Sequence, residues 1–451
     1  MRRLFGTDGV RGVANEDVSC ERSMQIGRAL GTVLSEKNRY KPTVLIARDT
    51  RVSSPMLSNA IVAGLLSVGA NVVDLGVLPT PAVAYLVREY GAKAGVMISA
   101  SHNPYQYNGI KIFGEGGYKF SDELEEQIEA IVLDNTPPYR LATSAEIGRK
   151  LEMPSAREDY VNYITSHGKS LEGLRIGIDT SNGSAAIMAE KIFRSLGAEC
   201  HMLADSPDGV NINCDCGSTS LDSLKKLVRD ERLDLGVAFD GDADRCLCVD
   251  EDGYEVDGDF IMAILAKKMK DEGRLQKNTV VGTVMTNYGF TKFCEEYDIK
   301  YIATKVGDRY VLEMMNQEGY SLGGEQSGHI IFRDYATTGD GQLTAVLLLS
   351  YISETKTSLK QLKNVMRKYP QYSQNINATQ SDKITFLVDS EIKEILSRCE
   401  KDISGRGKIV ARPSGTEPYI RIMVEGEDFS ETKKMCKSLA EKIKARLDML
   451  K

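Results

Sequence analysis

Residues 95–113, GVMISASHNPYQYNGIKIF, pass abruptly from an apolar run into a polar turn. Residues 95–99 are typical of a buried strand, and Pro104 can continue neither a strand ladder nor a helix. The strand must therefore end where Ser101, His102 and Asn103 occur together. Loops at the ends of buried strands often carry the chemistry of α/β proteins, so Ser101 is a candidate nucleophile. An ordinary turn capped by serine and asparagine side chains is the alternative.

A similar α/β unit occurs three times along the chain, in pattern rather than in identity. The units begin with apolar strands near residues 43–47, 174–179 and 280–284. Strands that alternate with helical patterns in this way predict largely parallel sheets with polar loops at the strand ends. The three units end in the loops SASHNP (99–104), DGDADR (240–245) and GGEQSGH (323–329).

The last section of the chain has a different pattern. The polar segment 369–377, YPQYSQNIN, is interpreted as a linker, and an alternating strand near 420–424 precedes a terminal helix that begins near Ser430. We therefore predict an α/β protein with three similar domains, whose mixed, largely parallel sheets surround a central cleft, and a smaller C-terminal α+β domain. The predicted domains span 1–153, 154–256, 257–369 and 370–451.

Composition restricts the possible functions. The 451 residues carry a net charge of −7 and no long block of lysine and arginine, which argues against binding to nucleic acid. No segment reaches the roughly 18 apolar residues that a membrane span needs, and the N-terminus lacks the apolar core of a signal peptide. The nine cysteines lack the spacing of a zinc site and are expected to be reduced thiols. We expect a cytoplasmic protein.

The loop DGDADR contains three closely spaced carboxylates, Asp240, Asp242 and Asp244. They would repel one another unless a cation neutralised them, and ligand sets made only of oxygen favour Mg²⁺. An acidic turn and the start of an EF-hand are the alternatives, but the glycine and the helix that an EF-hand requires are absent here. Arg245 follows the carboxylates, where it could stabilise phosphoryl oxygens or only balance their charge.

Other polar residues fit the binding of a phosphorylated sugar. In RPSGT, residues 412–416, a guanidinium, two hydroxyls and a glycine N–H have the chemistry of a phosphate site, although such residues also make ordinary turns. Glu325 and Ser327, in a glycine-rich loop, suit sugar hydroxyls. Lys111 and Arg11 are candidates for contacts to anions, and Lys111 could also assist proton transfer. Solvated side chains without such roles are the alternative.

Together, a serine that can carry phosphate, a divalent ion, a phosphate site and a loop that recognises hydroxyls predict phosphoryl transfer. The motifs SASHNP, DGDADR, GEQSGH and RPSGTEP, in this order and over essentially the whole chain, resemble those of the α-D-phosphohexomutase family. The resemblance implies an intramolecular phosphotransferase of the isomerase class that works through a phosphoserine and a sugar 1,6-bisphosphate. The opening FGTDGVRG and Gln326 favour the branch that interconverts glucosamine 6-phosphate and glucosamine 1-phosphate, which feeds the synthesis of UDP-N-acetylglucosamine and the bacterial cell wall.

The resemblance also implies roles for individual residues. Ser101 would be the phosphoserine, and its phosphate would hold one Mg²⁺ together with Asp240, Asp242 and Asp244. Lys111 and His329 would be general acid/base candidates. Glu325 and Ser327 would contact sugar hydroxyls, with Lys305 as a further contact. The remaining catalytic candidates are His102, Arg11 and Arg245, and the phosphate that is not transferred would bind Arg412, Ser414, Gly415 and Thr416.

Three other interpretations remain open. A phosphomannomutase or phosphoglucomutase would use the same residues and differ in its contacts to the sugar 2-position. A metal-dependent sugar phosphatase would release phosphate steadily and would need no bisphosphate. A sugar-phosphate sensor would need neither the serine nor the three aspartates. The family resemblance also suggests a homodimer. The polar segment interpreted as a linker suggests a C-terminal domain that swings, which would let the bisphosphate reorient.

Overall fold

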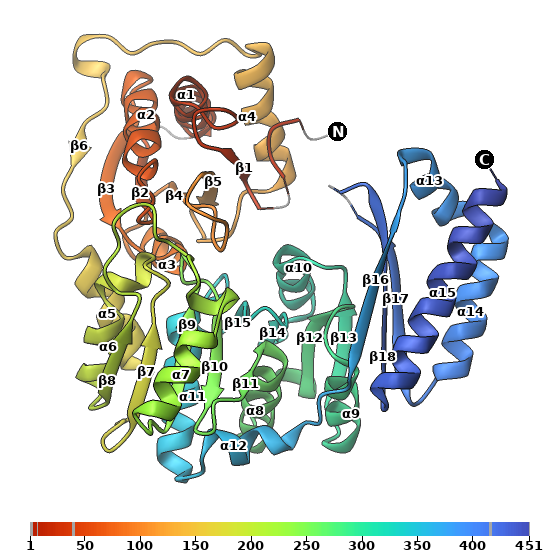
Figure 1. The fold of residues 1–451 in the computed structure, drawn as a ribbon. Coiled ribbons are helices and arrows are strands. Elements are labelled where there is room, and N and C mark those ends of the chain that lie inside the picture. The colour runs from red at the N-terminus through yellow and green to blue at the C-terminus, as the bar shows by residue number, and fades with distance from the viewer. Residues whose placement is uncertain (1–2, 7, 38–40, 415–416, 451) are drawn as a thin grey trace. The chain divides into compact units, whose positions relative to one another are not determined.

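The computed structural model describes residues 3–6, 8–37, 41–414 and 417–450. The chain forms two compact units: unit 1 contains Met1–Val281 and Gly307–Lys363, and unit 2 contains Gly282–Val306 and Asn364–Lys451. Figure 1 labels the helices and strands of both units. In the part of the chain that the structure describes, no helix is both long and apolar enough to cross a membrane.

The first sheet of unit 1 has six strands in the order β1-β5-β4-β2-β3-β6. Strands β4, β2, β3 and β6 are parallel, whereas β5 and β1 form antiparallel pairs at one edge. Helices α1, α2 and α4 cover one face of the sheet and α3 covers the other (Figure 1). The elements are β1 (Val10–Val13), α1 (Cys20–Lys37), β2 (Thr43–Arg48), α2 (Ser54–Ser67), β3 (Asn71–Val77), α3 (Thr80–Glu89), β4 (Ala94–Ile98), β5 (Tyr107–Gly114), α4 (Asp122–Asp134) and β6 (Lys150–Leu151).

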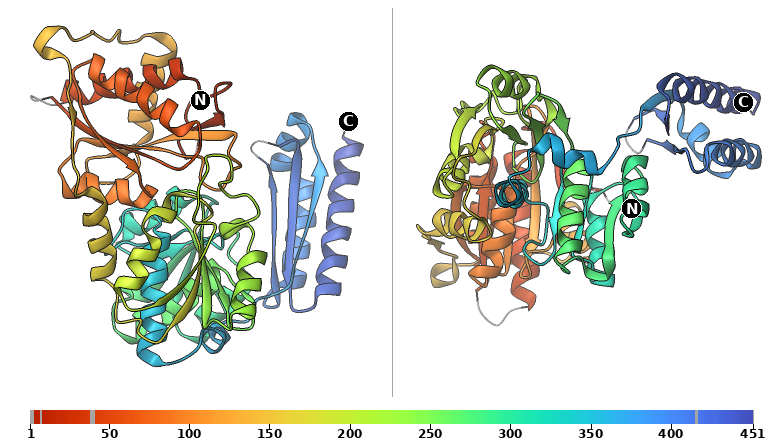
Figure 2. Two further views of the ribbon diagram at one scale, coloured as in Figure 1. Left: turned by 60° about the vertical axis from the view of Figure 1, so that its left-hand side comes forward. Right: turned by 90° about the horizontal axis from the view of Figure 1, so that it is seen from below.

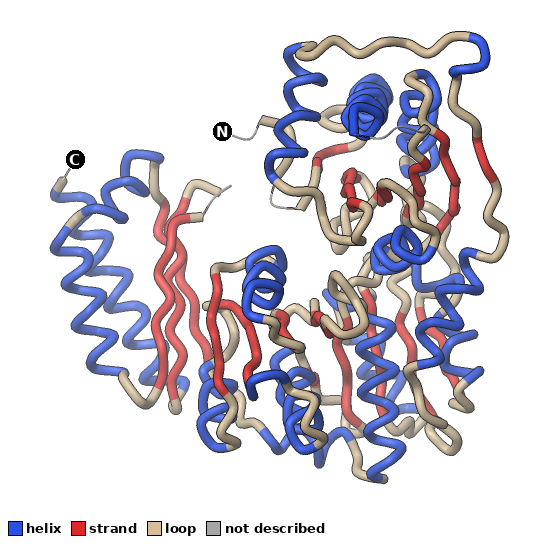
Figure 3. Tube along the Cα trace, turned by 180° about the vertical axis from the view of Figure 1, so that it is seen from behind, coloured by secondary structure: helices blue, strands red, loops and turns tan. Residues whose placement is uncertain are grey.

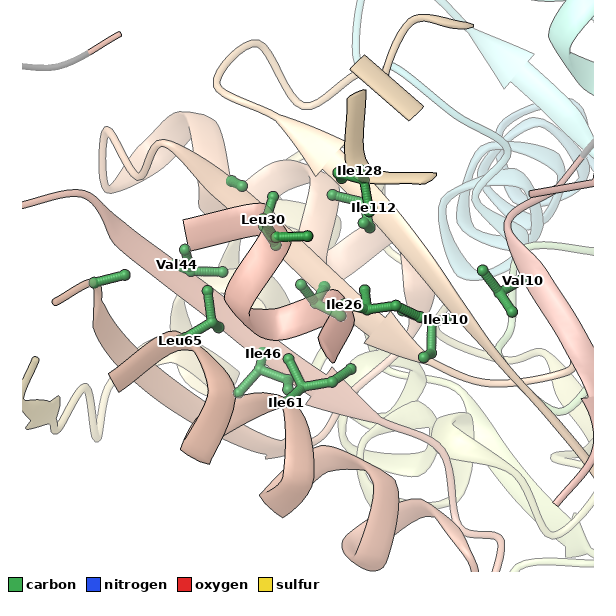
Figure 4. Packing of buried hydrophobic residues seen from close by; sticks show 14 of the residues in the cluster. Val10, Ile26, Leu30, Val44, Ile46, Ile61, Leu65, Ile110, Ile112 and Ile128 are labelled. Atoms are coloured by element: carbon green, nitrogen blue, oxygen red, sulfur yellow. The ribbon is translucent and has the colours of Figure 1, made fainter. Parts of the chain in front are cut away.

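Burial on both faces holds this sheet in place. Val44 and Ile46 of β2 lie in the core beneath α1 and α2, and Figure 4 shows Ile46 beside Ile61 of α2. Leu45, between them, is also buried but faces the opposite side, because side chains alternate along a strand. A strand that is covered on both faces has a carboxyl end in a fixed position. In this sheet, the carboxyl end of β4 leads into the loop of Ser101.

The second sheet of unit 1 has five strands in the order β11-β10-β9-β7-β8. Strands β9, β7 and β8 are parallel, and β9 and β10 form an antiparallel hairpin. In the next domain, β12 is parallel to β14, and β14 and β15 form another antiparallel hairpin. The elements are α5 (Ala156–Ser166), β7 (Arg175–Asp179), α6 (Ala189–Ser195), β8 (Glu199–Leu203), α7 (Asp222–Asp230), β9 (Leu235–Phe239), β10 (Cys246–Asp250), β11 (Glu255–Val256), α8 (Gly258–Asp271), β12 (Thr279–Thr283), α10 (Asp308–Glu318), β14 (Leu322–Gly324), β15 (Ile330–Phe332), α11 (Gly341–Thr355) and α12 (Leu359–Leu362).

The three motif loops of unit 1 have the same topological position. SASHNP connects β4 to β5, DGDADR connects β9 to β10, and GEQSGH connects β14 to β15. In each case the strand before the loop has a parallel neighbour on one side and the strand after the loop as an antiparallel neighbour on the other. The predicted mixed sheets are therefore confirmed, and each polar loop is the turn of an antiparallel pair.

Unit 2 contains an antiparallel sheet in the order β16-β18-β17. Helices α13, α14 and α15 cover one face of this sheet (Figures 2 and 3). The elements are α9 (Tyr288–Glu296), β13 (Lys300–Thr304), β16 (Gln371–Asn377), α13 (Gln380–Val388), α14 (Ser390–Ile403), β17 (Gly407–Pro413), β18 (Tyr419–Gly426) and α15 (Phe429–Met449).

The interpretation of residues 369–377 as a linker is wrong. Residues 371–377 form β16, an edge strand that pairs with β18 along its whole length. Ile376 is buried in the helix-covered core and Tyr372 packs against that core, but Gln374 stands between them on the same face. Because an edge strand with one covered face needs few apolar residues, the alternating pattern was too weak to indicate a strand.

Candidate active site

Ser101 lies in the turn between β4 and β5, and its side chain is buried. Its φ of +53° falls in the left-handed region, which costs a residue other than glycine roughly 1–2 kcal/mol. The hydroxyl of Ser101 donates to Oδ2 of Asp240 at 2.6 Å, and the N–H of Ser101 donates to Oγ of Ser99 at 2.9 Å. The strained turn therefore directs the serine oxygen at the aspartate loop.

Asp240, Asp242 and Asp244 form the turn between β9 and β10, and all three are buried. One oxygen of each lies within 4.8 Å of the others. Oδ2 of Asp242 accepts hydrogen bonds from Lys111 (2.8 Å) and Thr80 (2.5 Å). Within the described residues, however, Oδ1 of Asp242 and Oδ1 of Asp244 are buried without a hydrogen-bond partner.

These carboxylates fit a divalent cation. Burial, followed by the charges of Asp244 and Asp242, raises the pKa of Asp240 to about 8. The protein alone therefore does not stabilise three ionised carboxylates in this turn. Buried carboxylate oxygens without partners are costly, and a hard cation such as Mg²⁺ would satisfy them.

Gly241 allows the serine loop and the aspartate loop to approach each other backbone to backbone. A Cβ atom at residue 241 would lie 2.6 Å from the carbonyl oxygen of Ser101, which is closer than side-chain carbons come to other atoms. On the other side, a Cβ atom at Gly183 would lie 2.5 Å from the carbonyl oxygen of Gly241. The loop after β9 is thus packed against the loops that follow β4 and β7.

Lys111 of β5 provides the cation closest to the three aspartates. It is buried, and its Nζ lies 2.8 Å from Asp242, 3.4 Å from Asp244 and 3.2 Å from Asp8. Burial lowers the pKa of Lys111, but the carboxylates of Asp242, Asp8 and Asp244 outweigh burial and hold the pKa well above its ordinary value. Lys111 is therefore an ammonium ion here, suited to neutralise phosphoryl oxygens or to donate a proton.

The contacts of Lys111 belong to a closed ring of six titratable side chains, which we call the charge ring. Acidic groups alternate around it with lysines or a histidine, and its members come from all three α/β domains. In ring order the contacts are Lys111–Asp8 (3.2 Å), Asp8–Lys119 (2.5 Å), Lys119–Asp308 (2.5 Å), Asp308–His329 (3.5 Å), His329–Asp244 (3.6 Å) and Asp244–Lys111 (3.4 Å).

Sequence reasoning missed three members of the charge ring. Asp8 lies in FGTDGVRG, where only Arg11 was selected, and Asp308 lies in TKVGDR, where only Lys305 was selected. Lys119 stands in no motif at all. The signal available for Asp8 and Asp308 was a carboxylate within a glycine-containing loop, which is common on protein surfaces and so has little predictive value.

The two loop histidines have different surroundings. Nδ1 of His102 lies 3.4 Å from Oγ of Ser101, and burial, followed by the charges of Arg245 and Arg11, lowers the pKa of His102 to about 4. Its ring is therefore neutral near pH 7. Nε2 of His329 accepts the N–H of Gly339 at 3.0 Å, so the proton of its neutral ring is on Nδ1.

The electrostatic environment of His329 favours proton uptake. Burial lowers the pKa of His329, but Asp244 and Asp308 outweigh burial and raise it above its ordinary value. This buried imidazole faces a carboxylate at each ring nitrogen, so a proton that it takes up is stabilised from both sides. His329 is therefore suited to general acid/base chemistry.

Two arginines have N–H groups available for an anion. Arg11 forms an ion pair with Asp8, and Arg245 lies with Nε 3.9 Å from Oδ1 of Asp244. Across the described residues, Nε of Arg11 and Nε of Arg245 are buried without a hydrogen-bond partner. Guanidinium groups with unused donors are typical of phosphate sites.

The loop of Glu325 and Ser327 joins this site through His329. Glu325 accepts the N–H of Gly307 at Oε1 (3.1 Å), and its own N–H donates to the carbonyl of His329 (3.0 Å). Ser327 is half-buried in the same turn. Unit 1 thus brings together the sequence candidates Ser101, His102, Lys111, Arg11, Asp240, Asp242, Asp244, Arg245, His329, Glu325 and Ser327.

The other sequence candidates belong to unit 2. Lys305 follows β13, and Arg412 lies in β17, with its Nε buried and, over the residues described, without a hydrogen-bond partner. Ser414 donates its N–H to the carbonyl of Tyr419 (2.9 Å) and accepts the N–H of Glu417 at Oγ (3.1 Å). Gly415 and Thr416 lie outside the described residues.

Solved structures with the same fold are phosphohexomutases and related proteins. A phosphoglucomutase/phosphomannomutase family protein from Burkholderia thailandensis superposes with a TM-score of 0.82 at 21% identity, over 99% of this chain and 98% of that one. N-acetylphosphoglucosamine mutase from Aspergillus fumigatus, in complex with GlcNAc-6P and magnesium, superposes with a TM-score of 0.67 at 15% identity, over 99% and 96% of the two chains.

Sequence comparisons give much closer matches. A curated phosphoglucosamine mutase from Clostridium acetobutylicum is 49% identical over 447 residues, and one from Acetivibrio thermocellus is 48% identical over 448 residues; each match covers 99% of this chain and 100% of the relative. Family models for phosphoglucomutase/phosphomannomutase match as α/β/α domain I (residues 2–138), domain II (158–253), domain III (257–369) and the C-terminal domain (374–442).

The chain therefore belongs to the phosphoglucomutase/phosphomannomutase family. Membership confirms the predicted architecture of three α/β domains and one smaller C-terminal domain, and it confirms the prediction of a mutase.

Proposed function

We propose that this enzyme interconverts glucosamine 6-phosphate and glucosamine 1-phosphate by means of a phosphate carried on Ser101. The observation that carries the proposal is the buried Ser101 hydroxyl, 2.6 Å from Asp240. The other two carboxylates of the triad each have one buried oxygen that accepts no hydrogen bond from the described residues. The choice of an amino sugar draws on the curated relatives, which are phosphoglucosamine mutases about half identical to this chain over their full length.

In the proposed cycle, phosphoserine transfers its phosphoryl group to the free hydroxyl of the sugar monophosphate. The bond between Oγ of Ser101 and phosphorus breaks and Oγ takes up a proton, while a bond from the sugar oxygen to phosphorus forms and the sugar hydroxyl loses its proton. The product is the 1,6-bisphosphate, which reorients and returns its other phosphoryl group to Ser101. Neutral His329 is suited to accept the proton, and the ammonium of Lys111 is suited to neutralise the transferring group.

Asp240, Asp242, Asp244 and the phosphate on Ser101 would together hold Mg²⁺. When bound, this ion neutralises charge on phosphoryl oxygens, which is the main requirement of phosphoryl transfer. The unused N–H groups of Arg11 and Arg245 would add donors to the same phosphate. The protein contribution is then to hold donors, acceptors and the serine in fixed positions.

The proposal gives the remaining candidates binding roles. Glu325 and Ser327 contact sugar hydroxyls, and Lys305 is a further contact. The four domains are taken as 1–153, 154–256, 257–369 and 370–451. A cytoplasmic location and a homodimer remain predictions. The phosphate that is not transferred binds Arg412, Ser414, Gly415 and Thr416.

A coupled assay tests the proposal. The purified enzyme is given Mg²⁺ with glucosamine 6-phosphate, mannose 6-phosphate or glucose 6-phosphate in parallel, and release of inorganic phosphate is monitored. We expect preferential formation of glucosamine 1-phosphate, which Ser101→Ala abolishes. Strong preference for another hexose phosphate would contradict the amino sugar as substrate but not the mutase activity. Steady phosphate release without isomerisation would contradict the proposed cycle.

A further inference from the structure

Arg51 is a fully buried arginine in the loop that follows β2. A guanidinium has five N–H donors in a planar fork, and here the fork makes five hydrogen bonds. One bond goes from Nε to Oδ2 of Asp49 (2.8 Å). The other four go to backbone carbonyls: from Nη1 to Pro104 (2.5 Å) and Tyr107 (3.1 Å), and from Nη2 to Ser101 (2.9 Å) and Asn103 (2.7 Å).

All four carbonyls belong to the turn that presents Ser101, which we call the serine loop (residues 99–107). Their oxygens all accept from this one guanidinium, and without it each carbonyl would lose a donor, although those of Ser101 and Asn103 would keep Asn213 and that of Pro104 would keep the N–H of Tyr107. An unpaired buried carbonyl costs about 1–3 kcal/mol. The hydrogen bonds from Arg51 therefore stabilise the compact turn in which Ser101 has its left-handed φ.

The charge and position of Arg51 are fixed in turn by Asp49. Besides Nε, Asp49 accepts the backbone N–H of Arg51 (3.1 Å) and the hydroxyl of Ser54 (2.7 Å) at Oδ1. Because the guanidinium is held at one edge by a buried carboxylate, its opposite edge has a defined orientation toward the serine loop.

A second side chain contacts the same loop from the neighbouring domain. Nδ2 of Asn213 donates to the carbonyls of Ser101 (2.9 Å) and Asn103 (3.1 Å). These two carbonyls therefore accept hydrogen bonds from two sides, one from the loop after β2 and one from the segment after β8. No part of this arrangement uses a residue of the four motifs as a donor.

We infer that Arg51 is a positioning residue for phosphoryl transfer: its fork fixes the serine loop so that the phosphate on Ser101 stays in line with the metal aspartates and the incoming hydroxyl. The inference rests on the proposed function, which gives Ser101 its phosphate. A lysine at this position cannot reproduce the fork, because one ammonium has three donors and no planar geometry. The defect of Arg51→Lys should therefore appear in the chemical step.

Arg48 offers a matched control. It lies three residues before Arg51, forms an ion pair with Asp74 (3.2 Å), and makes none of the side-chain bonds to the serine loop that Arg51 makes in the described structure. The same Arg-to-Lys change is therefore made at both positions. For each variant we would measure kcat, KM, thermal unfolding, and the rate at which excess sugar bisphosphate phosphorylates Ser101 in a single turnover.

We expect Arg51→Lys to lower kcat and the rate of Ser101 phosphorylation about 100-fold, the effect of a misplacement of roughly 1 Å in a reacting group. KM should stay within about threefold, because the sugar-binding loops are unchanged, and Arg48→Lys should stay within about twofold in all parameters. Equal kcat in the two variants, or a loss of kcat that only follows the fraction of folded protein, would overturn the inference.

Two further arms keep the outcome decisive. If Arg51→Lys does not fold, Asn213→Ala removes the second pair of bonds to the same carbonyls, and an unchanged kcat in that variant would overturn the inference. The comparison uses whichever hexose phosphate the wild type converts, so a wrong sugar assignment leaves it intact. A wild type and Arg48→Lys that both isomerise no sugar phosphate would reject the proposed function, and the inference with it.

Discussion

The serine loop of unit 1 and residues 412–414 of unit 2 are both proposed to meet phosphate, yet they are held differently. In the serine loop, the buried Arg51 and the half-buried Asn213 donate to the backbone carbonyls, two of which accept from both side chains. In unit 2, Ser414 is tied through its own backbone and through Lys383, while Nε of Arg412 has no partner within the residues described. The carbonyls of the serine loop are thus hydrogen-bonded by the protein itself, whereas Arg412 keeps an N–H donor for a ligand.

This difference suits two different tasks. A group that reacts must be held within a fraction of an ångström, whereas a group that binds either end of a sugar bisphosphate must adapt to two orientations. Substitutions around the serine loop should therefore lower kcat, and substitutions at residues 412–414 should raise KM.

The largest effect is expected for Asp242→Asn. The change removes a charge and an oxygen from the proposed metal site, so turnover should fall by about 10³-fold even at saturating Mg²⁺. Steady-state assays over a range of MgCl₂ concentrations would measure both kcat and the Mg²⁺ requirement. Asp252→Asn, on the partly exposed turn after β10, is the control and should change neither by more than about twofold. A modest loss that excess Mg²⁺ fully restores would contradict a fixed metal site.

A smaller effect of a different kind is expected for Arg412→Lys. A lysine cannot bind phosphate through two parallel N–H groups, so KM should rise about tenfold, equivalent to about 1.4 kcal/mol, while kcat stays within about threefold. The control is Arg406→Lys, whose guanidinium donates to the carbonyl of Asp402 (2.8 Å) on its own side of the domain. A fall in kcat at constant KM would remove the proposed contrast between the two regions.

Substitutions in the charge ring should have coupled effects on kcat, of intermediate to small size. Lys119→Met and Asp308→Asn each break the link between Asp8 and His329, so each should lower kcat about fivefold. The double variant should be little worse than either single variant, because the pair acts as a unit. Activities that multiply as independent effects in this double-mutant cycle would show that the ring does not position His329.

The smallest effect concerns Asp179, which supports the neighbourhood of the serine loop. Its carboxylate accepts the N–H groups of Ser181 and Gly217, and burial raises its pKa to about 6. The folded state therefore holds this proton more tightly than the unfolded state, whose pKa is near 3.9. The stabilising effect of the protonated group is present below about pH 4 and is lost as the pH rises through 6.

Asp179→Asn removes this titration and also replaces one acceptor with a donor, so the variant should be less stable by about 1–3 kcal/mol. The advantage of the wild type in free energy of unfolding should be greatest near pH 4 and should shrink toward pH 7. Urea unfolding of both proteins at several pH values measures this difference in the free energy of unfolding. An advantage that grows between pH 4 and 6 would mean that the pKa of Asp179 is lowered by folding.

The sequence was sufficient for the fold class and the motif loops, because both depend on local patterns. Three apolar strands that end in charged loops are recognisable without coordinates, and the clustering of Asp240, Asp242 and Asp244 follows from their spacing alone. β16 was missed since an edge strand with one covered face can be almost entirely polar.

The side chains that hold the reacting groups in position could not be predicted from local patterns. Arg51 acts on carbonyls more than 49 residues away, and nothing local distinguishes it from Arg48, which pairs with Asp74. Lys119 and Asp308 are separated by 189 residues and meet only because the first and third α/β domains pack together within unit 1. Long-range contacts between charged side chains leave no periodic signal in a single sequence.

The absence of a side chain at Gly241 has a consequence for how such an enzyme can diverge. With the backbone of one loop resting on the carbonyl of Ser101, neither loop can change its path unless the other changes with it. A loop transplanted alone from a distant relative should therefore inactivate the recipient, even if every reacting residue is retained. The two loops must therefore be inherited together, and recombination sites that preserve activity should lie outside both loops.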